Sequence, residues 1–231
     1  MRTAAILPVK RFSDAKQRLR AHISAELRAT LARAMVADVL ETLATTPSID
    51  AVIIVSGERS LADAAADRGA ILIADDLESG QSAAVSRGVV AARAAGADRV
   101  LCVPGDCPGI DSDELEGLLR APARGAREVV VIPDRHGTGT NGLLIAPPDA
   151  IEPAFGEGSC ARHLSIARAA GVTVRVARPE SLLLDVDTGA DLDALRAQLA
   201  AAPSTAPHTL AVLGAHAQRQ PLAGRSVIGT A

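Results

Sequence analysis

Short apolar runs alternate along this chain with longer segments in which apolar residues recur every three or four positions. The first run covers residues 3–9. The segment after it has helical spacing, with apolar residues at Leu27, Leu31, Met35, Val39 and Leu43. A second apolar run, residues 51–55, ends at Ser56-Gly57. This alternation predicts buried strands that are followed by amphipathic helices.

The same alternation continues to about residue 200. Further strands are expected at residues 70–74, 99–103, 129–132, 142–146 and 172–176, and helices at 61–68, 80–95, 113–119, 162–170 and 191–199. Repeated strand–helix units with short connections predict an α/β fold, a three-layer αβα sandwich around a mostly parallel sheet. After Ile132 two strands follow each other with little helix between them, so we expect a mixed sheet with an antiparallel excursion there.

The chain after residue 200 has a different character. From Ala201 it is punctuated by proline, alanine and glycine, and its one apolar patch, residues 210–213, is weak. We therefore expect one domain over residues 1–200 and a flexible C-terminal extension over residues 201–231.

Composition excludes several classes of protein. A formal net charge of −3 gives no basic field for nucleic acid, and Phe12 and Phe155 are the only aromatic residues available to stack on bases. The three cysteines form no CxxC pair, which disfavours a disulfide framework and a zinc site. No apolar leader and no uncharged run of about 18 residues is present. We expect a cytoplasmic protein with neither a nucleic-acid nor a membrane partner, and the sequence does not indicate its oligomeric state.

An acid follows directly on one apolar run, in Val103-Pro104-Gly105-Asp106-Cys107-Pro108. Open α/β sheets bind their ligands outside the carboxyl ends of the strands. A carboxylate fixed there, between two prolines, can reach a metal ion without loop motion. The alternative is that Asp106 only caps the next turn or helix.

Two earlier loops are suited to the phosphates of a nucleotide. Four cations lie within nine residues after the first strand: Lys10, Arg11, Lys16 and Arg18. Ammonium and guanidinium groups bind polyphosphate, but a solvated basic turn explains these cations equally well, and the P-loop pattern is absent. In the second loop Gly80 lets a ligand approach the start of a helix, whereas Ser79 or Ser82 can simply cap that helix.

The later loops carry hydroxyls and alternating acids. Residues 133–141 place threonines between glycines, which offers N–H groups and hydroxyls to an oxyanion, and Ser159 lies where a helix begins. In the run 184–188, Asp185 and Asp187 have strand spacing and point to one face. Together with Asp106 they predict a site for a hard cation such as Mg²⁺, completed by water and phosphate. Capping of the last helix by Asp187 or Thr188 is the alternative, and both can hold together.

These segments together resemble the 2-phospho-L-lactate/phosphoenolpyruvate guanylyltransferases, which act in the biosynthesis of the deazaflavin coenzyme F-420. Five motifs within about residues 3–200 carry the resemblance: LPVKRFSDAKQRL at 7–19, PGDCP at 104–108, GTGTN at 137–141, FGEGS and RH across 155–163, and LDVDT at 184–188. The family is similar to the sugar-phosphate nucleotidylyltransferases, which implies a nucleotide-diphospho-sugar-transferase-like fold. Two motifs depart from it, since Gln81-Ser82 replaces a Leu-Asn pair and Gly105-Asp106-Cys107-Pro108 replaces Ala-Asp-Leu-Pro.

The resemblance implies a role for each matching residue. Lys16 and Asp106 would be catalytic, and Mg²⁺ would be bound by Asp106, Asp185 and Asp187. The contacts with GTP would come from Leu7, Lys10, Lys16, Gly80 and Ser82. The phosphorylated three-carbon acid would be held by Thr140, Asn141, Gly156 and Ser159.

The implied reaction is attack by an acceptor phosphate on the α-phosphorus of GTP with release of pyrophosphate. The acceptor would be phosphoenolpyruvate first and 2-phospho-L-lactate next, and its anionic phosphate requires no strong base. Two alternatives stay open, a nucleotidylyltransferase with a molybdenum-cofactor or sugar-phosphate acceptor and a non-catalytic nucleotide-binding domain. The first group opens with a glycine-rich loop, whereas residues 7–18 contain no glycine, and the retained Lys16 and acids disfavour the second. A dehydrogenase is disfavoured because no GxGxxG follows the first strand.

Overall fold

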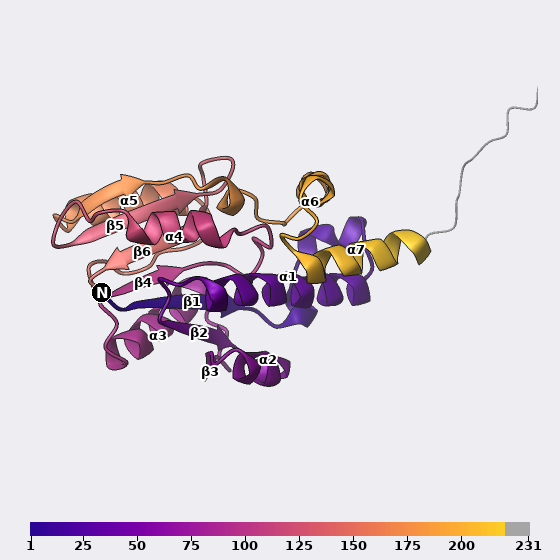
Figure 1. Cartoon of the computed structure of the whole chain (residues 1–231), viewed down its shortest axis with the longest axis horizontal. Helices are drawn as coiled ribbons and strands as arrows, with labels where there is room; N and C mark the ends of the chain where they lie inside the picture. The colour runs from indigo at the N-terminus through magenta and orange to yellow at the C-terminus, as the bar shows by residue number, and fades with distance from the viewer. Residues whose placement is uncertain (220–231) are drawn as a thin grey trace, which may run out of the picture.

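The computed structural model describes residues 1–219, which form an α/β structure around one seven-stranded sheet (Figure 1). The strands are β1 (Thr3–Val9), β2 (Ala51–Ser56), β3 (Ile71–Ala74), β4 (Arg99–Cys102), β5 (Glu128–Pro133), β6 (Thr140–Ala146) and β7 (Thr173–Val176). Their order in the sheet is β3-β2-β1-β4-β6-β5-β7. Strand β6 is antiparallel to both of its neighbours, and every other pair is parallel. The predicted mixed, mostly parallel sheet is confirmed, and β6 is its antiparallel excursion.

Helices fill the connections between the strands. They are α1 (Ala25–Thr45), α2 (Ala62–Asp67), α3 (Gln81–Ala94), α4 (Ser112–Arg120), α5 (Ser159–Ala169), α6 (Gly189–Ala201) and α7 (Pro207–Arg219). Short 3-10 helices are η1 (Phe12–Asp14), η2 (Gln17–Ala21), η3 (Arg59–Leu61) and η4 (Glu180–Leu182). None of the helices in residues 1–219 combines the length and hydropathy needed to cross a membrane.

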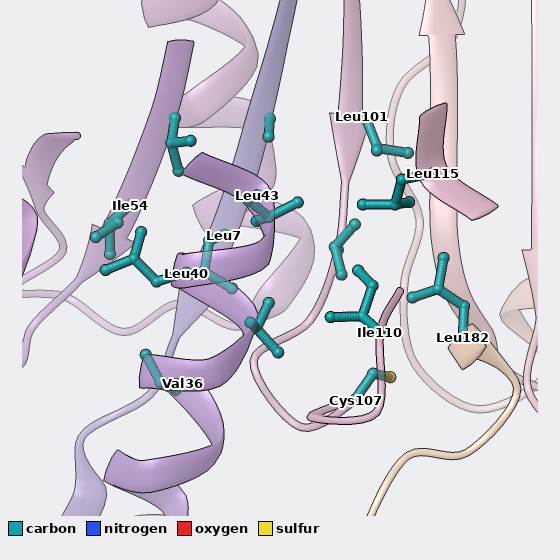
Figure 2. Close-up of a cluster of buried hydrophobic side chains, with 14 of the residues drawn as sticks. Leu7, Val36, Leu40, Leu43, Ile54, Leu101, Cys107, Ile110, Leu115 and Leu182 are labelled. Atoms are coloured by element: carbon teal, nitrogen blue, oxygen red, sulfur yellow. The ribbon is translucent and has the colours of Figure 1, made fainter. Parts of the chain in front are cut away.

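Two apolar layers cover the two faces of the sheet because successive strand residues point to opposite sides. Ala5 and Leu7 of β1 belong to the layer shared with α1, α2 and α4, whereas Ala4 and Ile6 belong to the layer shared with α3 and α5. Figure 2 shows the first layer, in which Leu7 lies among side chains of α1 such as Leu40. This arrangement confirms the predicted three-layer αβα sandwich.

Helix α7 differs from the expectation of a flexible extension after residue 200. It packs beside α1 (Figure 1) and contributes Leu213 to a third apolar cluster. The carboxylate of Asp38, a buried residue of α1, caps its first turn by accepting the N–H groups of His208 at 3.0 Å and Thr209 at 2.8 Å. For residues 207–219 the expectation is therefore corrected, because the cap and the packing surface come from α1. Residues 220–231 lie outside the described residues.

Candidate active site

A cavity of about 490 Å³ opens beyond the carboxyl ends of β1 and β4. These strands are parallel neighbours, so the loops that follow them meet at one edge of the sheet, where α/β folds bind ligands. The cavity wall also includes the start of α3 and one side of α1. Its charged and glycine residues are Lys10, Asp14, Lys16, Arg18, Asp75, Glu78, Gly80, Gly105, Asp106 and Asp187. The structure thus brings together four of the segments that the sequence analysis identified, the loops at 7–19, 75–82, 104–108 and 184–188.

Lys16 lies between two acids in this cavity. Its Nζ is 2.6 Å from Asp106 Oδ2 and 3.0 Å from Asp187 Oδ1, and only 7% of the side chain is exposed. Burial alone lowers the pKa of Lys16, but the two carboxylates outweigh it and hold that pKa above its ordinary value. The ammonium group is therefore charged at neutral pH. The backbone of Lys16 has a φ of 55°, an uncommon left-handed conformation, and η2 begins at the next residue.

Asp106 has one paired carboxylate oxygen and one unpaired oxygen. Oδ2 accepts from Lys16, whereas the buried Oδ1 has no hydrogen-bond partner. The backbone of Asp106 also joins two acid-bearing loops, because the N–H of Val186 donates to its carbonyl at 3.0 Å. Mg²⁺ commonly takes one or two carboxylates together with phosphate oxygens and water. The unpaired oxygen of Asp106, with Asp187 nearby on the same lysine, fits that requirement.

Asp185 is held separately from the lysine. Its Oδ1 accepts from Asn141 Nδ2 at 3.2 Å, and the same amide donates to the Leu182 carbonyl at 2.9 Å. Burial and then the charge of Asp106 raise the pKa of the Asp185 carboxyl. Among residues 1–219 no three acidic, histidine or cysteine side chains form a ready-made metal-ligand group. The three acids expected to form one site thus have different partners. Asp106 and Asp187 pair with Lys16, and Asp185 accepts a hydrogen bond from Asn141.

The other cations of the first loop have distinct surroundings. Arg11 Nε lies 3.3 Å from Glu78 Oε1, and Arg18 Nη1 lies 3.5 Å from Asp187 Oδ2. Lys10 is exposed and lines the cavity. These two ion pairs hold the first loop in addition to those of Lys16, and the loop still presents cationic groups to the cavity.

The expected nucleotide contacts in other segments are only partly brought to the cavity. Gly80 lines it with a φ of 99°, and a Cβ built there meets nothing within 4 Å, so its backbone borders open space. Ser82 is not among the lining residues, and its Oγ instead accepts the N–H of Phe155 at 2.8 Å. Leu7 is fully buried in the core, which keeps its side chain out of the cavity. Position alone therefore favours Gly80 over the side chains of Ser82 and Leu7.

Asp134 lies in the loop of residues 133–141, which was predicted to bind an oxyanion. Its Oδ1 accepts the N–H of Thr138 at 2.9 Å, and its Oδ2 accepts the N–H of Gly139 at 2.9 Å and the Thr138 hydroxyl at 3.2 Å. Burial acts in the opposite direction, but these donors hold the pKa of Asp134 below its ordinary value. The expected neutral cradle is corrected for this part of the loop, because the internal acid Asp134 already takes the donors of Thr138 and Gly139.

The residues expected to hold the acceptor are not among those that line the cavity, and one of them, Thr140, contacts a buried imidazole. Thr140 of β6 and Ser159 of α5 are buried, and Thr140 Oγ1 lies 3.0 Å from His163 Nδ1. Gly156 and Gly158 have φ angles of 113° and 68°, and a Cβ built at either meets nothing within 4 Å. No role was predicted for His163, although it ends the motif across residues 155–163. The available signal was its spacing, since a residue four positions after Ser159 lies on the same helix face.

Most of this chain matches one family of known proteins. Residues 3–198 match the family described as "Guanylyl transferase CofC like". The phosphoenolpyruvate guanylyltransferase of Conexibacter woesei is 47% identical over 213 residues, which cover 92% of this chain and 96% of that protein. The protein of the same name from Sphaerobacter thermophilus is 41% identical over 203 residues, covering 84% of this chain and 93% of that one.

Solved structures show the same fold. A putative nucleotide-diphospho-sugar transferase from Desulfovibrio desulfuricans G20 superposes with a TM-score of 0.74 at 19% identity, over 94% of this chain and 96% of that one. A nucleotidyl transferase from Methanothermobacter thermautotroptrophicus gives a TM-score of 0.60 at 21% identity, over 85% and 97% of the two chains. The family match spans most of the sequence, and the proteins from Conexibacter woesei and Sphaerobacter thermophilus both exceed 40% identity. The chain therefore belongs to the CofC-like guanylyltransferase family.

Proposed function

We propose that this protein transfers a guanylyl group from GTP to the phosphate of a small phospho-acid and releases pyrophosphate. Phosphoenolpyruvate is the first candidate acceptor, because the relatives at 47% and 41% identity carry that name, and 2-phospho-L-lactate is the second. The product would serve the biosynthesis of coenzyme F-420, as the family resemblance implies. The observation that carries the proposal is the position of Lys16 between Asp106 and Asp187 in the cavity.

The charges around the cavity support a polyphosphate ligand. An ammonium group has three N–H donors, and the two carboxylates account for two of those of Lys16. The third is available to a phosphate oxygen. Lys10 and Arg18 add positive charge on the cavity wall. A volume of about 490 Å³ lies within the usual range for small-molecule sites.

The chemistry of the proposed reaction needs orientation and charge compensation. An oxygen of the acceptor phosphate forms a bond to the α-phosphorus, and the bond from that phosphorus to the bridging oxygen of the β-phosphate breaks. Pyrophosphate leaves with the electron pair, and no general base is needed because the attacking phosphate is already an anion. Asp106 and Asp187 would bind Mg²⁺, which offsets phosphate charge when bound. Lys16 neutralises and orients the phosphates, and Phe12 and Met35 in the wall exclude water.

Product analysis tests the proposal. The protein is incubated with GTP, Mg²⁺ and phosphoenolpyruvate, 2-phospho-L-lactate or 3-phosphoglycerate in turn, and pyrophosphate release and product mass are measured. We expect a product in which a diphosphate bridge joins guanosine to the acid. ATP and CTP serve as matched controls and should be poorer donors than GTP. Turnover only with a sugar phosphate or molybdopterin would favour the alternative transferase. Binding of GTP without pyrophosphate release for any acceptor would favour a non-catalytic nucleotide-binding domain.

A further inference from the structure

A fully buried histidine links a strand, a helix and a loop beside the candidate acceptor residues. His163 of α5 is 0% exposed, and its Nδ1 lies 3.0 Å from Thr140 Oγ1 on β6. The backbone N–H of Ala154 donates to its Nε2 at 2.9 Å. Its ring meets that of Phe155 edge to face, with centroids 5.0 Å apart and an interplanar angle of 73°. Every polar atom of this imidazole is therefore engaged within the protein.

The backbone contact determines which ring nitrogen carries the proton. The amide N–H of Ala154 can only donate, so Nε2 of His163 must present its lone pair. A neutral imidazole then carries its proton on Nδ1, and this N–H donates to Thr140 Oγ1. Because the Thr140 oxygen acts as an acceptor in this bond, its own hydroxyl proton stays available for another group.

The environment of the ring keeps it in this neutral form. Burial, with a smaller contribution from the charge of Arg162, lowers the pKa of His163 to about 4. At neutral pH the ring therefore carries one proton, which the contact with Ala154 assigns to Nδ1.

The segment that contacts Nε2 is anchored from two further sides. The N–H of Phe155 donates to Ser82 Oγ at 2.8 Å, and Arg162 Nη1 donates to the Ala154 carbonyl at 2.9 Å. Gly156 follows directly, with a left-handed φ and open space around it. The histidine thus fixes both the strand that carries Thr140 and the entry to the glycine loop.

We propose that His163 is a positioning residue for the phospho-acid, because its Nδ1–H occupies the Thr140 oxygen and reserves the Thr140 hydroxyl proton for an anionic oxygen of the acceptor. The inference rests on the proposed function, since it takes Thr140 as part of the acceptor site. If Thr140 instead donated its proton to the imidazole, its oxygen would present only lone pairs to the acceptor, and these lone pairs would repel an anionic oxygen. His163 acts through Thr140 and the Ala154–Gly156 segment and does not itself touch the substrate.

Two conservative substitutions separate the two hydrogen bonds of His163. The side-chain amide of asparagine reaches the place of Nδ1, so His163→Asn can keep the donor to Thr140. The amide of glutamine reaches the place of Nε2, so His163→Gln can keep an acceptor for Ala154 but loses the donor to Thr140. His163→Phe removes both bonds and keeps a ring against Phe155. His136→Gln, at an exposed loop histidine, is the matched control.

Binding of phosphoenolpyruvate and of GTP is measured separately by calorimetry in the presence of Mg²⁺. We expect His163→Gln and His163→Phe to raise the phosphoenolpyruvate Kd about ten- to a hundredfold, the range for losing a hydrogen bond to a charged group. His163→Asn should restore much of that loss, and the GTP Kd should change less than about twofold in all three. Adding His163→Gln to Thr140→Val should cause no further loss, because both changes remove the same donor.

Several results would overturn the inference. They are an unchanged phosphoenolpyruvate Kd in His163→Gln, equal weakening of both ligands, or additive effects of His163→Gln and Thr140→Val. The ¹⁵N resonances of the wild-type ring give a readout that needs no variant, and a proton on Nε2 would also overturn the inference. Wild-type protein that binds no phospho-acid would refute the proposed function itself. Wild-type protein that binds phosphoenolpyruvate no better than His163→Gln would refute the positioning role alone.

Discussion

Lys16 Nζ and Asp106 Oδ2 lie 2.6 Å apart although 90 positions separate these residues in the chain. Apolar packing helps to bring the charged loops together. Leu19, three residues after Lys16, and Val186, directly before Asp187, are fully buried in one cluster with side chains of α1, α6 and α7. The site therefore depends on an apolar cluster outside the main sheet layers, and changes in that cluster can reach the charged groups.

Replacement of Asp106 by asparagine should abolish most turnover with little loss of stability. The amide keeps the shape of the side chain and removes its charge, while Asp187 still pairs with Lys16. We expect kcat to fall about 10²–10³-fold, as for the loss of one preorganised electrostatic group. Pyrophosphate release and thermal unfolding measure the two effects, and Asp113→Asn at an exposed position of α4 is the control. Near-normal activity would refute the role assigned to Asp106.

Replacement of Lys16 by methionine should weaken GTP binding first. Methionine keeps most of the volume, but a phosphate loses its buried cationic partner, and two carboxylates are left without their shared counter-ion. The GTP Kd should rise about ten- to a hundredfold, with some loss of stability at neutral pH. Lys10→Met, at an exposed lysine of the same loop, should have a smaller effect. Loss of acceptor binding with unchanged GTP binding would show that Lys16 serves the other substrate.

The hydroxyls of Thr140 and Ser159 should act on the acceptor. If each donates to an anionic group of the phospho-acid, Thr140→Val and Ser159→Ala should lower kcat/KM for the acceptor about ten- to a hundredfold. Steady-state kinetics with either substrate varied separate this from an effect on GTP, whose affinity should change much less. Variants that lose GTP binding and keep acceptor binding would show that the two subsites are exchanged.

The fold and the principal charged residues could be predicted because their signals are local. Apolar runs predict the strands of the sheet and helical spacing predicts the helices. The position of Asp106, soon after the apolar run 100–103, predicts that it is a site residue. The role of Asp134 could not be predicted in this way, because a loop of glycines and threonines has the same sequence whether its donors bind an anion or an internal acid. The same limit applies to His163, whose tautomer is fixed by a backbone group of another segment.

The formation of helix α7 also could not be predicted from the sequence pattern. Its large apolar residues are only Leu210, Val212 and Leu213, and its N-terminal cap comes from Asp38, 170 positions before His208. The local sequence pattern alone therefore does not predict this helix. Tertiary packing outweighs weak local propensity here, as it commonly does for helices with one apolar face.

Replacement of Asp38 by alanine should destabilise the protein measurably. The change leaves two N–H groups of the first turn of α7 without an acceptor and a small void in α1. The free energy of unfolding should fall by about 1–3 kcal/mol in a urea titration. Asp63→Ala, at an exposed position of α2, should change it by less than about 0.5 kcal/mol. Deletion of residues 203–231 should cost more than Asp38→Ala, because it also uncovers the apolar cluster that contains Leu213.

The buried His163 should make the stability of this protein fall between pH 7 and pH 5. The pKa of His163 is lowered to about 4 in the folded protein, whereas an unfolded histidine titrates near 6.5. As the pH falls through this window, the unfolded chain takes up a proton that the folded chain does not, so acid favours unfolding. The difference amounts to about 2 kcal/mol at pH 5, and carboxylates contribute little above that pH. Urea titrations of wild type, His163→Gln and His136→Gln should show the slope in the wild type and in His136→Gln, and its loss in His163→Gln. A slope that persists in His163→Gln would place the titrating group elsewhere and remove this support for a neutral ring.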